Sequence, residues 1–149
     1  MFSTESLIVL GLVIIVALVW LPRKSVEARL LVEAPPKAVW AVFINNTNCA
    51  GWNPIGVGVS GDMRPGGKLA LDIKLEDGAQ SQITVTADAM LEYQSIQQSA
   101  GVAGIPTAHH EWLLEPAKEG TLAVQREPYC GVGVLFYDPA HVEWKALKI

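Results

Sequence analysis

Three side chains that can transfer protons or bind metal ions stand together at His109-His110-Glu111. The alternation of polar and apolar residues around them predicts a strand. In that strand His110 shares a face with the apolar Trp112, and its two neighbours point to the opposite face. Glu127 on the following predicted strand could lie beside His110, and such a pair can act as general acid and base.

A second interpretation of this cluster is a half-buried histidine that only hydrogen-bonds a neighbour. A metal site would need a third ligand at a suitable position, and His141 is too remote in the sequence to supply a spacing argument, so we predict no metal. Serine nucleophile motifs, phosphate-binding glycine loops and CxxC pairs are absent from the sequence. Gly131-Val132-Gly133 is too short for a dinucleotide fingerprint and more typical of a bend, so we predict no cofactor.

Aromatic residues are the other candidates for a binding site, because ligand cavities are mostly apolar with a few polar anchors. With His110, the predicted ligand-binding residues are Trp40, Phe43, Trp52, Trp112 and Tyr129. The alternative is that these aromatic side chains only fill a core.

The elements that would position these residues follow from the apolar pattern. Val26, Ala28, Leu30 and Val32 alternate with polar residues, which predicts a half-buried strand. Apolar residues at helical spacing after Pro35-Pro36 predict a short amphipathic helix. The remaining predicted elements are strands at 57–60, 69–75, 82–88, 91–98, 107–115 and 121–129 and a helix from Ala140 onward, after Asp138-Pro139. This order predicts an α+β domain with helices on one face of an antiparallel sheet.

The composition limits the classes of partner. The net charge is −4 and the basic residues are scattered, which argues against nucleic-acid binding. Cys49 and Cys130 are far apart in the sequence, and we expect two free thiols; a disulfide is the alternative if the domain faces an oxidising compartment.

The run from Leu7 to Leu21 is uninterrupted by any polar residue, and counting from Phe2 gives 20 residues, enough to cross a bilayer. We therefore predict a transmembrane anchor over residues 1–22, a short linker over 23–25 and a folded domain over 26–149. A cleaved signal peptide and a buried core helix are the alternatives, but no basic residue precedes the run and the run has no polar face.

The basic residues Arg23, Lys24 and Arg29 follow the apolar run, and none precedes it. The positive-inside rule therefore predicts a single-pass membrane protein with its domain on the cytoplasmic side. Because the linker is so short, we expect the domain to lie against the headgroups, with any cavity within reach of lipid.

Several motifs in order resemble the START-like, or SRPBCC, superfamily, which includes polyketide cyclase-like and Bet v 1-like proteins. The resemblance covers about residues 26–137 and rests on Val32-Glu33-Ala34-Pro35 with Val39-Trp40, Trp52-Asn53-Pro54, Gly61 with Gly66-Gly67-Lys68, His110-Glu111-Trp112, Leu114-Glu115-Pro116, Gly120-Thr121, Glu127 and Gly131.

This resemblance implies a helix-grip fold, in which an antiparallel sheet curves around a long C-terminal helix and leaves an apolar cavity, with Trp40 and Trp112 as walls. It implies a module that binds a small hydrophobic ligand or lipid. An enzyme of cyclase or hydrolase type that uses His110 and Glu127 is an alternative. The segment after Asp138 is shorter than the family's final helix. A third expectation is therefore a non-catalytic interaction domain with a vestigial pocket.

Overall fold

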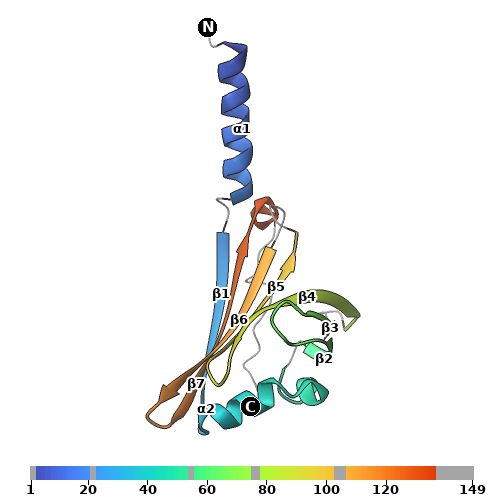
Figure 1. Cartoon of the computed structure of the whole chain (residues 1–149), viewed down its shortest axis with the longest axis vertical. Helices are drawn as coiled ribbons and strands as arrows, with labels where there is room; N and C mark the ends of the chain where they lie inside the picture. The colour runs from blue at the N-terminus through green and yellow to red at the C-terminus, as the bar shows by residue number, and fades with distance from the viewer. Residues whose placement is uncertain (1–2, 21–22, 54–55, 75–77, 103–106, 137–149) are drawn as a thin grey trace.

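The computed structural model describes residues 3–20, 23–53, 56–74, 78–102 and 107–136. These residues form one seven-stranded antiparallel sheet with a helix, α1 (Thr4–Trp20), extending from one end (Figure 1). The strand order across the sheet is β1-β7-β6-β5-β4-β3-β2. The strands are β1 (Arg23–Val32), β2 (Gly56–Gly61), β3 (Lys68–Lys74), β4 (Gln80–Leu91), β5 (Ser95–Gly101), β6 (Thr107–Ala117) and β7 (Gly120–Cys130).

The alternation predicted for the first strand is confirmed. In β1 every second residue from Val26 to Val32 is half-buried, and the residues between them are exposed. The strand begins earlier than expected, because Arg23, Lys24 and Ser25 already pair with β7, so the predicted linker over 23–25 is part of the sheet. The sheet therefore starts close to the end of α1.

Two short helices and a 3-10 turn connect β1 to β2: α2 (Pro36–Phe43), η1 (Asn46–Asn48) and α3 (Cys49–Trp52). Pro36 opens α2 at a position where a missing N–H is harmless. The helix buries Val39, Trp40 and Phe43 and packs against β6 and β7. It thus crosses the inner face of the sheet at the end opposite α1 (Figure 1).

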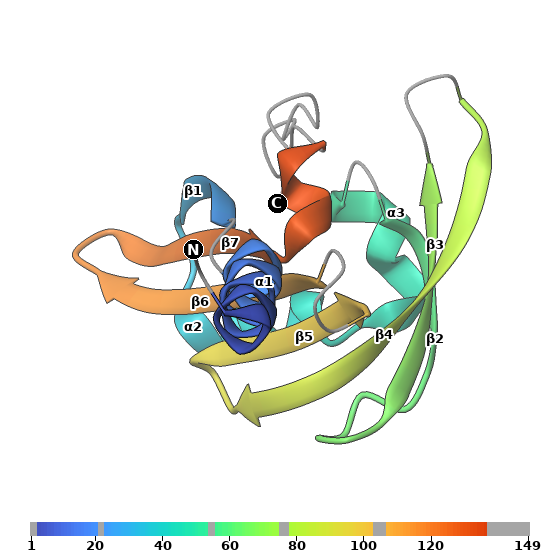
Figure 2. The ribbon, with the colours of Figure 1, turned by 90° about the horizontal axis from the view of Figure 1, so that it is seen from above.

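The sheet is strongly curved, so β2, β3 and β4 stand at a steep angle to β1, β7 and β6 (Figure 2). Register shifts occur in β2 between Gly56 and Gly58 and in β4 between Ala87 and Ala89. Such bulges add bend and twist to a strand. The curvature makes one face of the sheet concave, and α2 and α3 lie against it.

The apolar interior has two parts. The larger one joins the helices to the middle strands and contains Val39, Trp40, Phe43, Cys49, Trp52, Ile96, Trp112, Leu114 and Ala123. The smaller one, of Leu69, Val85 and Ala87, lies on the curved β3–β4 side. Val59 packs against both, so the two parts are continuous.

The convex face carries a network of charges across β1, β7 and β6. Glu27 accepts hydrogen bonds from Arg29 at 2.7 Å and from Arg126 at 2.9 Å. These bonds lower the pKa of the Glu27 carboxyl below its ordinary value, the bond from Arg29 most. Arg126 also lies 3.6 Å from Glu111. This face is solvated, which leaves the concave face for binding.

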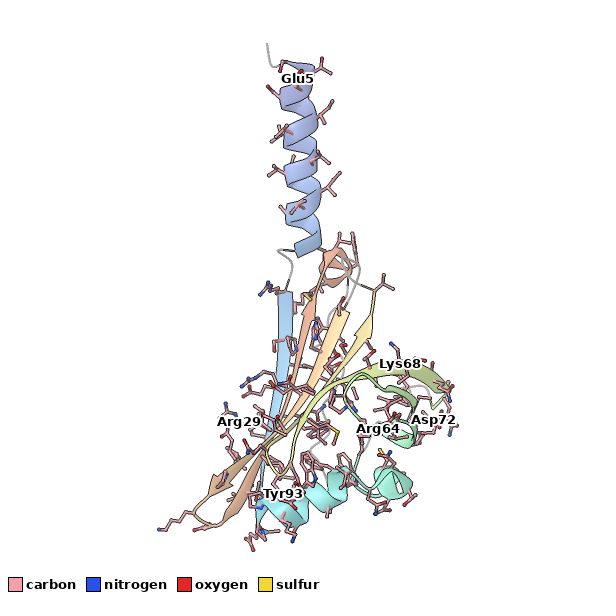
Figure 3. All side chains as sticks on the ribbon, in the orientation of Figure 1. Glu5, Arg29, Arg64, Lys68, Asp72 and Tyr93 are labelled. Carbon is pink, nitrogen blue, oxygen red and sulfur yellow. The ribbon has the colours of Figure 1, made fainter. Side chains whose placement is uncertain are left out.

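The apolar segment at the start of the chain forms α1, with large side chains exposed on every side from Leu7 to Val16 (Figure 3). The helix has 17 residues, and of the helices in the described parts of the chain none is long and apolar enough to cross a membrane. Phe2 and Leu21, which complete the predicted 20-residue span, lie outside the described residues.

The helix predicted from Ala140 onward also lies outside the described residues. The last described element is η2 (Val132–Leu135), a 3-10 turn that follows Gly131. Gly131 has φ of 107°, a left-handed conformation that favours glycine. The bend predicted at Gly131-Val132-Gly133 therefore has a backbone basis.

Candidate functional site

A cavity of about 60 Å³ lies between the helices and the concave face of the sheet. Its walls come from the α2–α3 segment, from β2 and β3, and from β5 and β6. The lining residues are Phe43, Asn45, Asn46, Cys49, Trp52, Asn53, Val59, Met63, Leu71, Ile96, Gln98, His110 and Trp112. None of these residues is an Arg, Lys, Asp or Glu, so the wall carries no permanent charge.

Three aromatic rings form one side of the cavity. Phe43 stacks on Trp52 with ring centroids 5.0 Å apart and lies 4.8 Å from Trp112. The two indole rings meet edge to face at 5.5 Å. All three contacts fall in the range of favourable aromatic pairs. The ring of His110 continues the cluster, 5.2 Å from Trp112.

The loop after α3 fixes the position of Trp52. The side chain of the next residue, Asn53, accepts a hydrogen bond from the Gly56 amide at 2.8 Å, which closes the turn. The thiol of Cys49 donates to the Gly56 carbonyl at 3.4 Å. A side chain at position 56 would crowd both Asn53 and Cys49, so glycine suits this close approach. Of the predicted turn at Trp52-Asn53-Pro54, Pro54 lies outside the described residues, and the hydrogen bond between Asn53 and Gly56 links the end of α3 to the start of β2 beside one wall of the cavity.

The indole N–H of Trp52 is a buried donor without a hydrogen-bond partner, the one such side-chain atom among the described residues. Trp52 is only 8 % exposed. Leaving a buried donor unpaired costs about 1–3 kcal/mol, and native structures contain few such groups. Trp52 also lines the cavity, so a ligand that shifts this indole could supply the missing acceptor.

Two further polar side chains reach the cavity from the sheet. Gln98 of β5 is buried and donates weakly to the Met63 sulfur at 3.9 Å. His110 of β6 pairs across the ladder with Gln98. The cavity therefore combines an aromatic wall with a small polar group on the opposite strands.

The predicted neighbourhood of His110 and Glu127 is present in the structure. Nδ1 of His110 lies 3.6 Å from Oε2 of Glu127, with both side chains mostly buried. This distance is longer than a hydrogen bond, although it is close enough for an ion pair when the imidazole is protonated. As predicted, His109 is exposed on the opposite face.

Of the predicted ligand-binding residues, the structure brings Phe43, Trp52, His110 and Trp112 to the cavity. Trp40 and Tyr129 are buried but are not among the lining residues. Trp40 instead packs edge to face against Tyr93 in the β4–β5 turn, at a centroid distance of 6.2 Å. These two side chains follow the alternative interpretation, in which an aromatic residue fills the interior.

Sequence reasoning missed several lining residues, among them Cys49, Val59, Ile96 and Gln98. Cys49 was expected only as a buried thiol, and burial does raise its pKa. Ile96 and Gln98 are both at inward positions of β5, and that spacing is a signal that could have identified them. A glutamine at an inward position is the more informative of the two, because burial of an amide is costly.

The distance of the cavity from α1 can be followed along β6. Arg23, Cys130, Thr107 and Gly101 pair in a row at the α1 end of the sheet. Trp112 is five residues further along β6, about 17 Å from that row at ~3.4 Å per residue. Trp112 on the cavity wall therefore lies well away from the end of α1, and the position of the cavity relative to lipid stays a prediction.

Comparison by sequence finds no family model and no curated protein that matches this chain. Comparison by structure finds many solved structures with a similar fold at low identity.

The AHSA1-like protein from Aeromonas hydrophila is 17 % identical with a TM-score of 0.60, and the match covers 79 % of this chain and 81 % of that one. The di-domain ARO/CYC StfQ from the steffimycin biosynthetic pathway is 14 % identical with a TM-score of 0.59, over 72 % of this chain and 37 % of that one. Ara h 8.0201 is 17 % identical with a TM-score of 0.55, over 73 % and 78 %.

Likeness at such identities concerns the fold and not the activity. The order strand, helix, then an antiparallel sheet curved over the helices agrees with the predicted α+β class. The described residues therefore share with the AHSA1-like protein and the ARO/CYC di-domains a fold in which an antiparallel sheet curves over helices, consistent with a helix-grip; the C-terminal helix of a helix-grip would fall outside the described residues.

Proposed function

We propose that this protein binds a small, neutral, hydrophobic ligand in the cavity between α2, α3 and the concave face of the sheet, and that its apolar N-terminal segment holds it at a membrane. The unpaired indole N–H of Trp52, a residue that lines the cavity, is the observation that carries the binding part of this proposal. The fold alone indicates no ligand, whereas the Trp52 N–H is a specific hydrogen-bond donor that has no partner in the protein.

The chemistry of the wall defines the ligand class. Stacked aromatic rings favour an apolar group, and the absence of charged lining residues disfavours an anion or cation. The donor on Trp52 selects an acceptor oxygen, such as that of a ketone, ester or ether. At about 60 Å³ the cavity is smaller than the ~300 Å³ of ordinary ligand sites, so the part of the ligand that enters is small.

The binding test uses two neutral probes of nearly equal shape, cyclopentanone and methylenecyclopentane, in which a CH2 group replaces the carbonyl oxygen. Protein with ¹⁵N-labelled tryptophan gives five indole signals, of which the Trp52 signal is assigned with Trp52→Phe. We expect cyclopentanone to move the Trp52 signal downfield, as a new hydrogen bond does, and to bind about 5–10-fold more tightly than the hydrocarbon.

A matched pair of variants controls this test. Val59→Phe places a ring in the cavity and abolishes binding of both probes, whereas Ile83→Phe makes the same kind of enlargement at an exposed position and leaves binding intact. If neither probe binds, and native mass spectrometry of the detergent-extracted protein finds no retained small molecule, the protein is a non-catalytic interaction domain with a vestigial pocket.

The membrane part of the proposal rests on α1. Its large side chains are apolar and exposed around the whole helix, an arrangement that is stable in lipid and costly in water. Arg23 and Lys24 follow it in the sequence and favour the cytoplasmic side for the domain.

Washing of membranes with alkaline carbonate tests the anchoring. The protein should stay in the pellet, and Val13→Lys with Ile14→Lys should release it, because each charge costs about 2.5–3.5 kcal/mol in the middle of a bilayer helix. Release of the unmodified protein would contradict anchoring without affecting the binding proposal.

A second candidate function is acid–base catalysis of cyclase or hydrolase type. The observation that favours it is the approach of Glu127 to His110, a residue of the cavity wall, at 3.6 Å. The molecule that co-purifies should then be converted to a product of different mass or, for an isomer formed by cyclisation, of different chromatographic retention by the wild type but not by Glu127→Gln. An unchanged mass and an unchanged retention in both samples would contradict this candidate function.

A further inference from the structure

One end of the sheet lies next to α1, and the four strands that begin or end there are paired with one another. Arg23 at the start of β1 pairs with Cys130 at the end of β7, and Cys130 pairs with Thr107 at the start of β6. Thr107 in turn pairs with Gly101 at the end of β5. The turn η2, which follows β7, therefore lies at the same end of the domain as the helix (Figure 1).

Three large apolar side chains at this end are more than half exposed. Phe136, after η2, is 89 % exposed; Leu135, the last residue of η2, is 55 % exposed; and Val102, after β5, is 62 % exposed. The hydroxyl of Thr107 donates to the Val102 carbonyl at 3.2 Å, which holds Val102 near the row of strand ends. Because exposed apolar groups gathered at one place mark contact surfaces, this end is a candidate for one.

Basic side chains accompany the apolar ones. Arg23 and Lys24 open β1 at this end, and both are exposed. Apolar side chains beside basic ones are the composition of surfaces that lie on anionic membranes. We define the membrane rim as Arg23, Lys24, Val102, Leu135 and Phe136.

The rim is continuous with the apolar helix. The 3-10 turn η2 is in contact with α1, and the view from above shows the two side by side (Figure 2). A bilayer that surrounds α1 therefore meets Leu135 and Phe136 first. A second copy of this chain would have to reach the same surface past the lipid.

We propose that the membrane rim is a second membrane-contact site of the folded domain, in which Phe136, Leu135 and Val102 enter the interfacial layer of an anionic bilayer while Arg23 and Lys24 lie at its phosphate groups. The inference rests on the membrane part of the proposed function. It goes further, because it fixes how the domain stands: the rim faces the lipid, and α2 and the cavity point away from it.

The sequence offers a favourable experiment, since it contains only three phenylalanines, Phe2, Phe43 and Phe136. The full chain labelled with 4-fluorophenylalanine is placed in nanodiscs of phosphatidylcholine and phosphatidylglycerol and observed by ¹⁹F NMR. One relaxation agent is a water-soluble gadolinium chelate, and the other is a lipid with a nitroxide near the top of its acyl chain.

The three signals serve as probe and internal controls. Phe43 is buried in the domain and should respond to neither agent, whereas Phe2 belongs to the apolar segment and should respond to the lipid nitroxide. The proposal expects Phe136 to be broadened by the lipid nitroxide and protected from the chelate. Leu91→Phe, a matched exposed position near Tyr93 at the opposite end (Figure 3), should show the reverse.

Each other outcome overturns a defined statement. A Phe136 signal broadened only by the chelate, with Phe2 broadened by the lipid, contradicts the rim but leaves the anchor in place. A Phe136 signal protected from both agents identifies a protein contact, such as a second copy, in place of lipid. A Phe2 signal untouched by the lipid nitroxide overturns anchoring and the rim together.

The basic part of the rim has its own test. Each basic residue close to an anionic surface contributes about a fivefold factor to binding, so Arg23→Gln with Lys24→Gln should markedly reduce the lipid-induced broadening of Phe136. The wild type should show a similar reduction in discs of phosphatidylcholine alone. Equal broadening in all three samples would show that the apolar residues act without the charges.

Discussion

The unpaired donor on Trp52 makes an unusual prediction about stability. Trp52→Phe removes the pyrrole edge of the ring together with the N–H that lacks a partner. Trp112→Phe makes the same chemical change in a neighbouring ring of the same aromatic cluster, 6 % exposed against 8 % for Trp52. The two variants therefore form a matched pair in which only the Trp52 indole carries a fully buried N–H without a partner.

The expected free energies follow from two opposing terms. Truncation of a buried Trp to Ala costs about 3–5 kcal/mol, and the loss of the pyrrole edge is about a third of that, roughly 1–2 kcal/mol. At Trp52 the substitution also relieves the penalty of a buried unpaired donor, about 1–3 kcal/mol. We expect Trp52→Phe to lie within about 1 kcal/mol of the wild type, and Trp112→Phe to be destabilised by roughly 1–2 kcal/mol.

Urea unfolding in a mild detergent, followed by far-ultraviolet circular dichroism, measures the difference. The slope of the free energy against urea concentration should be the same for the three proteins, so that the midpoints report stability directly. Equal destabilisation of the two variants would refute the reasoning, because it would mean that the Trp52 donor is satisfied in the ligand-free protein. The binding proposal would then lose its principal observation.

Two other predictions concern the stability of the fold that holds the site. Gly120 has φ of 140°, and a Cβ there would collide with the Val32 carbonyl, so Gly120→Ala should lower the free energy of unfolding by more than about 3 kcal/mol. Gly66 has φ of 85° and open space around it, so Gly66→Ala should lower it by only about 1 kcal/mol. Thermal unfolding of the two variants separates the effect of the collision from that of the backbone conformation. Hydrogen bonds from Arg64 lower the pKa of Asp62 from 3.8 to about 2, so this contact stabilises the fold above pH 3.8 and is lost as the pH falls through 2. The substitution Arg64→Gln should return the pKa of Asp62 toward 3.8, which an NMR titration of the carboxyl group measures.

The strand pattern could be predicted well wherever one face of a strand meets the core. In β1 and β6 the alternation of the sequence matches the alternation of burial, because a half-buried strand repeats every two residues. For the same reason His110 and Trp112 were assigned correctly to one face. The predicted proximity of Glu127 followed from its place on the adjacent strand.

The boundary between β4 and β5 could not be predicted from that pattern. A strand was expected over 91–98, but residues 92–94 form a turn and β5 begins at Ser95. Tyr93 has φ of 63° in this turn, a left-handed conformation that usually signals Gly, Asn or Asp. Because tyrosine carries no such signal, the sequence continued to read as a strand.

The division of the aromatic residues between core and cavity also lay beyond the sequence. Trp40 and Phe43 are on the same buried face of α2, yet only Phe43 lines the cavity. What separates them is the β4–β5 turn, whose Tyr93 covers Trp40. Trp40 and Tyr93 are 53 positions apart in the sequence, so the spacing of apolar residues within either segment could not predict their contact.

The distance between the membrane rim and α2 can be followed along β1, and this distance constrains how the two proposed sites can cooperate. Val26 of β1 lies beside Glu127 near the α1 end, and Val32, the last residue of the same strand, packs on the interior cluster beneath α2. A strand of ten residues spans about 33 Å, so a domain that stands on the membrane rim holds its helices well away from the headgroups. Under both proposals the ligand is expected to exchange with the aqueous side. This expectation agrees with a cavity for a small neutral group with a polar acceptor better than with one that takes a lipid chain directly from the bilayer.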